Sequence, residues 1–158
     1  MSTTLNVSSV PNLYILNANS IAKPHALDQL AAELACYSID VALISETHLK
    51  SRHLSSLIHI DGYQLYRRDR LARRNGGVAA FVKDTLDSEV IQPSSSDDRS
   101  MEILWVKVNM PTRVVLLCSL YHPPSPIYET ASLLDRLESE VQQLCKTYIV
   151  LSSHYHRR

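Results

Sequence analysis

The chain has 158 residues, 45% of them hydrophobic, and its 16 basic residues (Lys and Arg) equal its 16 acidic ones. This length predicts one domain with its own core, and the charge balance excludes a protein that attracts nucleic acid through its overall charge. No apolar run approaches a membrane span, and the polar first dozen residues carry no secretory signal. The chain is therefore expected to be intracellular, nuclear or cytoplasmic, and not bound to a membrane.

The three cysteines, Cys36, Cys118 and Cys145, form no Cys-x-x-Cys pair. Each lies in an apolar, periodic segment, so we expect small core residues rather than metal ligands. An odd number of cysteines is typical of a reducing compartment.

The chain is expected to begin with a flexible leader (residues 1–11), followed by a short β-prone strand over residues 13–16. Pro24 then opens a helix, at the position where its missing N–H does no harm. The apolar residues of this helix recur at helical spacing and predict one buried face. They are Leu27, Leu30, Ala31 and Leu34.

An unbroken, mostly apolar run over residues 41–45 predicts a strand buried on both faces, and it leads directly into Glu46. A strand–helix–strand unit predicts parallel neighbours. Asn17 and Asn19, which follow the first strand, should therefore emerge at the same sheet edge as Glu46. Taken alone, Glu46 is either a metal- or proton-handling carboxylate or the first polar residue of a loop.

Residues 63–67 and 78–82 read as two strands of a hairpin. Their connection contains five arginines over residues 67–74 and the turn signal Asn-Gly-Gly over residues 75–77. The arginines either meet phosphate groups or form a solvated surface loop. Three nearby histidines fit no usual zinc pattern, namely His48, His53 and His59.

Two further strands are predicted over residues 101–108 and 114–121, and the short link between them predicts antiparallel neighbours. Pro123 and Pro124 stop strand pairing and force an extended exit. They are expected to hold Tyr121 and His122 at a rigid strand end.

A long helix is predicted over residues 128–145, followed by a last strand over residues 148–151. Glu138 and Glu140 are expected to point outward into solvent. The inward stripe of the helix is predicted to be Leu134, Leu137, Val141, Leu144 and Cys145.

These strand ends suggest one constellation of side chains. A carboxylate with amide oxygens suits a hard cation such as magnesium, which takes few protein ligands and keeps several waters. A neighbouring arginine-rich loop suits a phosphate substrate. Metal-assisted phosphodiester hydrolysis uses both features. The residues at the strand ends are Asn17, Asn19, Glu46, Tyr121, His154 and His156.

Five segments together resemble the endonuclease/exonuclease/phosphatase superfamily, and most closely the endonuclease domain of non-LTR retrotransposons. They are residues 16–20, 44–49, 66–70, 76–79 and 120–124, in that order. The resemblance extends from about residue 13 to the end of the chain. It implies an α/β protein, a two-sheet sandwich like deoxyribonuclease I, that cuts double-stranded DNA with magnesium, manganese being the alternative ion.

The resemblance also implies roles for single residues. Asn17, Glu46 and Tyr121 would form the catalytic set: Asn17 orients the phosphate and Tyr121 lies against it. Glu46 would be the main metal ligand, with Asn17 beside it and Asn19 in the outer shell. His122 stands where many relatives have arginine. The residues expected near the DNA backbone are Arg67, Arg68 and Arg70.

The end of the chain departs from the family. Relatives have Gly-Asp-Phe-Asn after a strand, whereas this chain places His154 at the Asp position and His156 at the Asn position. A neutral histidine cannot supply the negative charge of an aspartate, so neither histidine is given a catalytic role. The family's remaining strands and its closing Ser-Asp-His motif have no counterpart. Residues 12–158 are therefore expected to form an incomplete domain that lacks the C-terminal strands, with an exposed apolar surface or a partner that covers it.

The leading hypothesis is a retroelement-type endonuclease domain that nicks DNA with magnesium, truncated and impaired in this copy. One alternative is a catalytically dead remnant with weak nucleic-acid binding. Another is a phosphatase of the same superfamily that acts on lipid or nucleotide phosphates.

Overall fold

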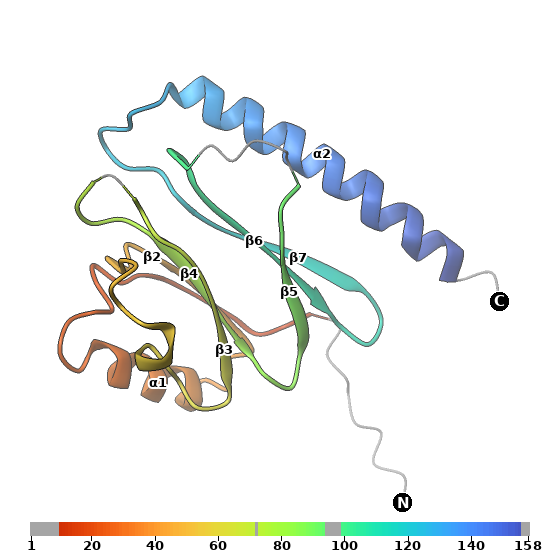
Figure 1. Ribbon diagram of the computed structural model, residues 1–158. Helices are drawn as coiled ribbons and strands as arrows, with labels where there is room; N and C mark the ends of the chain where they lie inside the picture. The colour runs from red at the N-terminus through yellow and green to blue at the C-terminus, as the bar shows by residue number, and fades with distance from the viewer. Residues whose placement is uncertain (1–9, 72, 94–98, 156–158) are drawn as a thin grey trace, which may run out of the picture.

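The computed structural model describes residues 10–71, 73–93 and 99–155, with side chains up to Tyr148. Most of the predicted leader and part of the loop before residue 99 lie outside the described residues. The elements, in chain order, are β1 (Leu13–Asn17), α1 (Ala26–Cys36), β2 (Val41–Ser45), the 3-10 helix η1 (Ser55–Leu57), β3 (Tyr63–Arg68), β4 (Val78–Lys83), β5 (Asp87–Ile91), β6 (Glu102–Asn109), β7 (Val114–Tyr121) and α2 (Thr130–Tyr155) (Figure 1).

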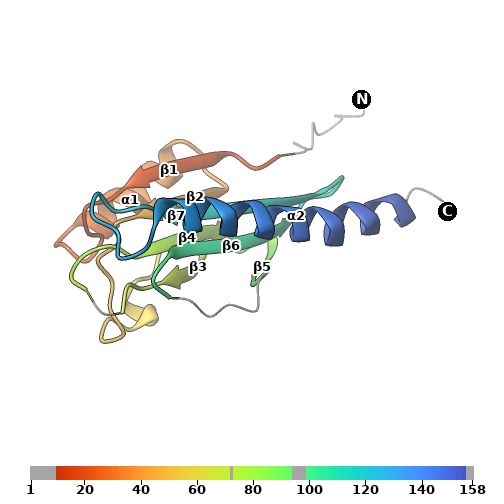
Figure 2. The same ribbon diagram turned by 90° about the horizontal axis from the view of Figure 1, so that it is seen from above.

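The strands form two sheets, one in the order β1-β2-β4-β3 and the other in the order β5-β6-β7. Helix α1 packs on the outer face of the first sheet and α2 on the outer face of the second. The two sheets lie face to face between the helices (Figures 1 and 2). Their inner faces enclose an apolar core to which β2, β4, β6 and β7 contribute. The predicted two-sheet α/β sandwich is therefore confirmed.

The first sheet follows the sequence prediction closely. β1 and β2 are parallel, from the pair Leu13–Val41 to the pair Asn17–Ser45. β3 and β4 form the predicted antiparallel hairpin, and β2 pairs with β4. The side chains of β2 alternate between the α1 side and the inter-sheet core, which is why the whole apolar run is buried.

Helix α1 has the predicted apolar face, since Leu30 and Leu34 are buried and Leu27 and Ala31 pack beside them. It begins at Ala26 and not at Pro24, because His25 takes a left-handed backbone conformation (φ 62°) at the N-cap. That conformation ends the preceding turn, so Pro24 lies before the helix rather than in its first turn.

In the second sheet, β6 pairs antiparallel with β7, as predicted. β5, which also pairs with β6, was not predicted. Its sequence, Asp-Ser-Glu-Val-Ile, contains only two apolar residues. Such a segment becomes a strand because β6 supplies a partner, and this is a tertiary effect that local sequence does not record.

The predicted last strand over residues 148–151 is wrong, since α2 runs without a break to Tyr155. No Gly or Pro interrupts residues 130–155, so nothing in the local sequence ends the helix. A helix also satisfies its own backbone hydrogen bonds, whereas a strand requires a neighbour. The C-terminal turns of α2 extend past the sheets in both views (Figures 1 and 2).

The inward face of α2 agrees with part of the predicted stripe, since Leu144 is buried and Leu137 packs against the second sheet. Leu133 and Glu140, which were not in the stripe, are also buried, whereas Leu134 is 60% and Val141 43% exposed. Cys145, also predicted to point inward, is exposed. The prediction counted apolar residues alone, so it included three that are exposed and omitted the buried Glu140.

Glu140 was predicted to be solvated and is instead 2% exposed. Its carboxylate accepts hydrogen bonds from Trp105 Nε1 at 2.7 Å and from Arg136 Nε at 2.8 Å. Two donors compensate the cost of burying this charge and fasten α2 to the second sheet.

The cysteine prediction is also partly wrong. All three thiols are free, but Cys36 and Cys145 are exposed and only Cys118 is partly buried. Burial raises the pKa of the Cys118 thiol to about 12, so this thiol is inert at neutral pH.

Strand β1 exposes apolar side chains. Ile15 is 76% and Leu13 44% exposed. Their partners in β2, Leu43 and Val41, lie on the same face of the sheet and are buried against the second sheet. The second sheet therefore covers β2 but not β1. Among the described residues, no helix has the length and apolar character that a membrane crossing requires.

Candidate active site

Asn17 and Glu46 meet at one edge of the first sheet, as the strand–helix–strand prediction required. The turn after β1 bonds to the turn after β2, since Ala18 N donates to Ser45 O at 2.9 Å and Ser20 N donates to Glu46 O at 2.7 Å. The Asn17 side chain forms a hydrogen bond with the Glu46 carboxylate. Asn19 lies in the same turn, where its backbone N–H donates to Asn17 Oδ1 at 3.2 Å.

Tyr121 reaches Glu46 from the second sheet, at the end of β7. Its phenol donates a hydrogen bond to the Glu46 carboxylate. This bond, followed by the one from Asn17, lowers the pKa of Glu46. The same bond raises the pKa of Tyr121 to about 12. Glu46 is therefore ionised, and Tyr121 is a protonated donor, throughout the neutral range.

The backbone at this site is strained. Glu46 (φ 51°) and His48 (φ 55°) both take left-handed conformations, which are costly for residues with a side chain. Two hydrogen bonds hold the segment in place, from Thr47 N to Gly77 O at 3.1 Å and from His48 N to Gly76 O at 2.8 Å. Such strain typically persists where the surrounding structure fixes a functional side chain.

Gly76 and Gly77 permit this close approach. A Cβ on Gly77 would lie 2.6 Å from Thr47 Oγ1, and a Cβ on Gly76 would lie 2.4 Å from Arg70 Cζ. Both glycines also have positive φ, 72° and 88°. The Asn-Gly-Gly turn therefore supports the Glu46 segment as well as reversing the hairpin.

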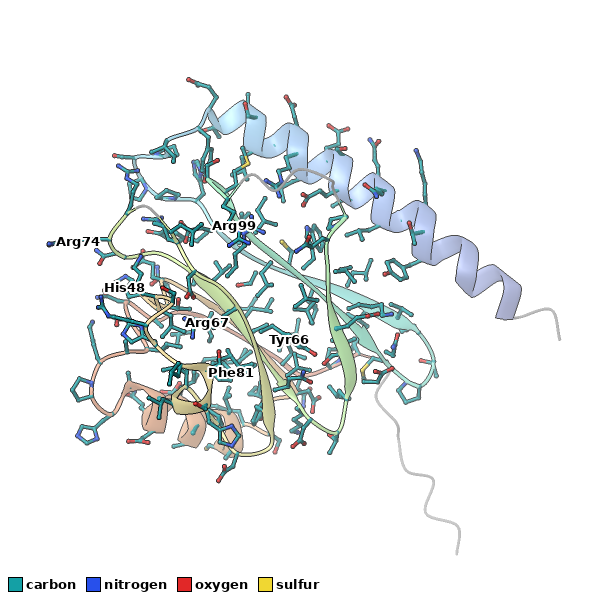
Figure 3. All side chains as sticks on the ribbon, in the orientation of Figure 1. His48, Tyr66, Arg67, Arg74, Phe81 and Arg99 are labelled. Carbon is teal, nitrogen blue, oxygen red and sulfur yellow. The ribbon has the colours of Figure 1, made fainter. Side chains whose placement is uncertain are left out.

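Arg67, one of the arginines predicted to lie near DNA, is bonded within the protein. Its guanidinium pairs with Asp69 and donates to His53 O at 2.7 Å and to Lys50 O at 2.8 Å. Lys50 Nζ in turn donates to Arg70 O at 2.8 Å. Figure 3 shows Arg67 directed into the body of the molecule and Arg74 directed away from it.

Arg70 is also bonded within the protein. Its Nε–H donates to Glu102 Oε1 at 2.6 Å, and Gly77 N–H donates to Glu102 Oε2. Glu102 was missed in the sequence, although a signal was present. It is in phase with the buried residues Leu104, Val106 and Val108 of β6, so period-two alternation places a carboxylate on the inner face.

The strand ends border an open cleft of about 480 Å³. Glu46 and Tyr121 line it together with the arginine-rich loop, which adds the exposed side chains of Arg73 and Arg74. A cationic rim beside a carboxylate and a phenol suits a phosphodiester. The predicted DNA contacts of Arg67, Arg68 and Arg70 stay predictions, and Arg73 and Arg74 are further candidates in the same loop.

The histidines do not converge on one point. His48 Nε2 lies 3.8 Å from Glu46 Oε2 and is buried without a hydrogen-bond partner, and burial lowers the pKa of His48. His53 Nδ1 accepts a hydrogen bond from Lys50 N at 2.9 Å, and His122 Nδ1 lies 3.2 Å from Tyr128 Oη. His154 falls within α2, and His156 lies outside the described residues.

The donor set at the strand ends was tested against a metal ion. In the described part of the chain, no group of three or more His, Cys, Asp or Glu side chains could hold one. Magnesium needs fewer protein ligands, since it binds through one or two carboxylates and keeps several waters. Glu46 is ionised, 22% exposed and accompanied by the Asn17 amide. These residues therefore fit a largely hydrated magnesium ion.

The two sheets, with a carboxylate, an amide and a phenol meeting at their strand ends, define a recognisable class. The chain has the α/β sandwich fold of a solved AP endonuclease and of a solved retrotransposon endonuclease domain, which is the fold that the sequence resemblance implied. No family model and no curated protein sequence matches it. The fold assignment therefore rests on solved structures.

One similar structure is the endonuclease domain of TRAS1, a telomere-specific non-LTR retrotransposon (20% identity, TM-score 0.58, 82% of this chain and 53% of that chain). Another is an AP endonuclease from Archaeoglobus fulgidus (21% identity, TM-score 0.58, 87% of this chain and 52% of that chain). A third is D. rerio TDP2 complexed with a single-strand DNA product (16% identity, TM-score 0.53, 84% of this chain and 53% of that chain). This chain thus spans about half the length of each, and at these identities the similarity establishes the fold alone.

Proposed function

We propose that this chain is a retroelement-type endonuclease domain that nicks double-stranded DNA by magnesium-dependent phosphodiester hydrolysis, with impaired activity. The observation that carries the proposal is that Glu46 and Tyr121, from two different sheets, line one cleft, while Asn17 ends its strand opposite Ser45, the residue before Glu46. The TRAS1 endonuclease domain and the AP endonuclease, which share the fold, support the choice of reaction. An intracellular location, in nucleus or cytoplasm, belongs to the same proposal.

In this proposal Glu46 and Asn17 hold the ion, magnesium or alternatively manganese. When bound, the ion neutralises charge on the phosphate oxygens and makes the phosphorus more susceptible to attack by water. Tyr121 keeps its proton up to high pH and so offers a hydrogen-bond donor at the cleft. Arg73 and Arg74 attract the phosphate backbone from the rim.

Impairment is proposed because Glu46 has few acidic or histidine neighbours that could share a metal ion. Among the described residues, no group of three or more His, Cys, Asp or Glu side chains could hold a metal ion, and by the resemblance His154 takes the position where the family has aspartate. A histidine does not replace a carboxylate at a hard-cation site.

A plasmid-nicking assay tests the proposal. We expect slow conversion of supercoiled DNA to the nicked form with magnesium or manganese, and none with a chelator. Glu46→Gln should reduce the rate by about 100-fold or more. Glu138→Gln is the matched control, because Glu138 is exposed on α2 and far along the chain from the site. An unaffected Glu46→Gln variant, or no nicking with either metal, overturns the proposal.

A second candidate is a non-enzymatic domain that binds nucleic acid, favoured by the exposed Arg73 and Arg74 at the rim. In that case DNA binding survives Glu46→Gln and weakens when both arginines become glutamine. Each arginine that contacts a phosphate should contribute about 0.9 to the slope of log K against log salt. TDP2, whose structure contains a DNA product, supports nucleic acid as the ligand class.

A further inference from the structure

A buried ion pair lies between the arginine-rich loop and the second sheet. Arg70 Nε–H donates to Glu102 Oε1 at 2.6 Å. Arg70 Nη2 lies within ion-pair distance of the same oxygen but without hydrogen-bond geometry. The Glu102 side chain is 4% exposed and the Arg70 side chain 15%. Since Gly77 N–H donates to the other carboxylate oxygen, Glu102 is fixed from two sides.

This pair borders Tyr121. Glu102 and Tyr121 are direct cross-strand partners on β6 and β7. The Arg70 guanidinium carbon lies 5.6 Å from the centroid of the Tyr121 ring, within the range of a cation–π contact. Gly76 leaves room for that guanidinium, since a Cβ there would lie 2.4 Å from Arg70 Cζ.

We propose that Arg70 and Glu102 are positioning residues that hold the Tyr121 ring in the orientation in which its phenol meets Glu46. The effect of this positioning on catalysis rests on the proposed endonuclease function. The position of the ring itself does not depend on that function. Arg70 would therefore serve the site through Tyr121 and not only through the DNA backbone, the role that resemblance gave it.

The charges explain why two residues are needed. An arginine buried alone would cost more than its contact with the ring could return, so its position depends on the carboxylate that neutralises it. Glu102 in turn anchors the Gly77 turn, which holds the Glu46 segment through Thr47. The ion pair thus contacts the Tyr121 ring through Arg70 and supports the Glu46 segment through Glu102 and Gly77.

Two substitutions separate these parts. Glu102→Gln keeps the size of the side chain but replaces one of the two accepting oxygens with an NH2 group, which then faces the N–H of Arg70 or of Gly77 as a second donor. Arg70→Lys keeps the charge and its partner but removes the planar group that lies over the ring. Glu140→Gln is the matched control, because Glu140 is 2% exposed and pairs with Arg136 on the other face of the second sheet.

The direct measurement is the NMR spectrum of protein with 13C-labelled tyrosine rings, with the Tyr121 signals assigned from Tyr121→Phe. We expect those signals to shift in Glu102→Gln and in Arg70→Lys, while the signals of Tyr66, whose hydroxyl donates to Ser88 O, stay unchanged. Glu140→Gln should leave Tyr121 unaffected. Unmoved Tyr121 signals in a folded variant, or the same shift in Glu140→Gln, overturn the proposal.

The kinetic measurement is plasmid nicking. A displaced phenol should lower kcat by about tenfold or more, while in Arg70→Lys, which leaves Glu102 and the Gly77 turn intact, the manganese dissociation constant, measured by calorimetry with the ion alone, should stay within about twofold. If Glu102→Gln does not fold, Arg70→Lys decides both measurements. If the unaltered protein does not nick DNA, the endonuclease proposal fails, and the Tyr121 signals still decide the positioning role.

Discussion

Replacing Tyr121 with phenylalanine removes one hydrogen bond and leaves the ring. That bond is donated to an ionised carboxylate, and hydrogen bonds to charged groups contribute about 1.5–3 kcal/mol. Because the Glu46 side chain is 22% exposed, we expect the lower end, about 1.5 kcal/mol of unfolding free energy at pH 7. With the usual urea dependence, the midpoint should fall by about 0.5–1.5 M.

The unfolding free energy lost in Tyr121→Phe should depend on pH, and the direction of that dependence follows from the lowered pKa of Glu46. A carboxyl whose folded pKa is depressed stabilises the protein above its unfolded pKa, about 4.3, and that contribution disappears as pH falls through the folded pKa. The difference between the unaltered protein and Tyr121→Phe should therefore be full at pH 7 and smaller at pH 3. Urea denaturation at both pH values measures it.

Tyr66→Phe is the control, because Tyr66 donates to the neutral carbonyl of Ser88 at 2.8 Å. Its loss should be of similar size and the same at both pH values. A loss in Tyr121→Phe that does not change with pH would refute the assignment of the phenol to the Glu46 carboxylate.

Two further predictions concern the turn and the thiols. In thermal denaturation, Gly77→Ala should lose more unfolding free energy than Gly62→Ala. Both glycines have positive φ, which costs an alanine about 1–2 kcal/mol. A Cβ at Gly77 also meets Thr47 Oγ1, whereas one at Gly62 meets nothing within 4 Å. A thiol reagent at pH 8 should modify the two exposed cysteines of the folded protein at once and Cys118 only on unfolding, because burial raises the pKa of Cys118 to about 12. Mass spectrometry of peptides measures the rate at each cysteine, and equal rates for all three would contradict this.

Where sequence reasoning succeeded, the signal was local or topological. The apolar run of β2 and the helical spacing of Leu30 and Leu34 each record burial within one element. The meeting of Asn17 with Glu46 followed from a single rule, that parallel neighbours end at the same edge. Tyr121 was placed at a strand end by the two prolines that follow it, and the structure brings it to the same cleft as Glu46.

Where it failed, the cause lies in partners distant in sequence. Glu102 and Glu140 are buried beside Arg70 and Trp105, which lie far from them along the chain. Local sequence shows only part of this, namely the period-two alternation around Glu102 and the Arg136–Glu140 spacing. β5 is a strand because β6 lies beside it. The prediction of a last strand failed because it relied on local composition alone. The apolar residues 149–151 suit a strand by composition, but they continue a helix that nothing interrupts.

The left-handed backbone at Glu46 places stability and chemistry in opposition. A residue with a side chain pays about 1–3 kcal/mol for such a conformation, and glycine would not. A library selected for heat resistance alone should therefore enrich glycine or asparagine at position 46. Under selection for DNA cleavage the carboxylate would be retained, so the two screens should diverge at this codon.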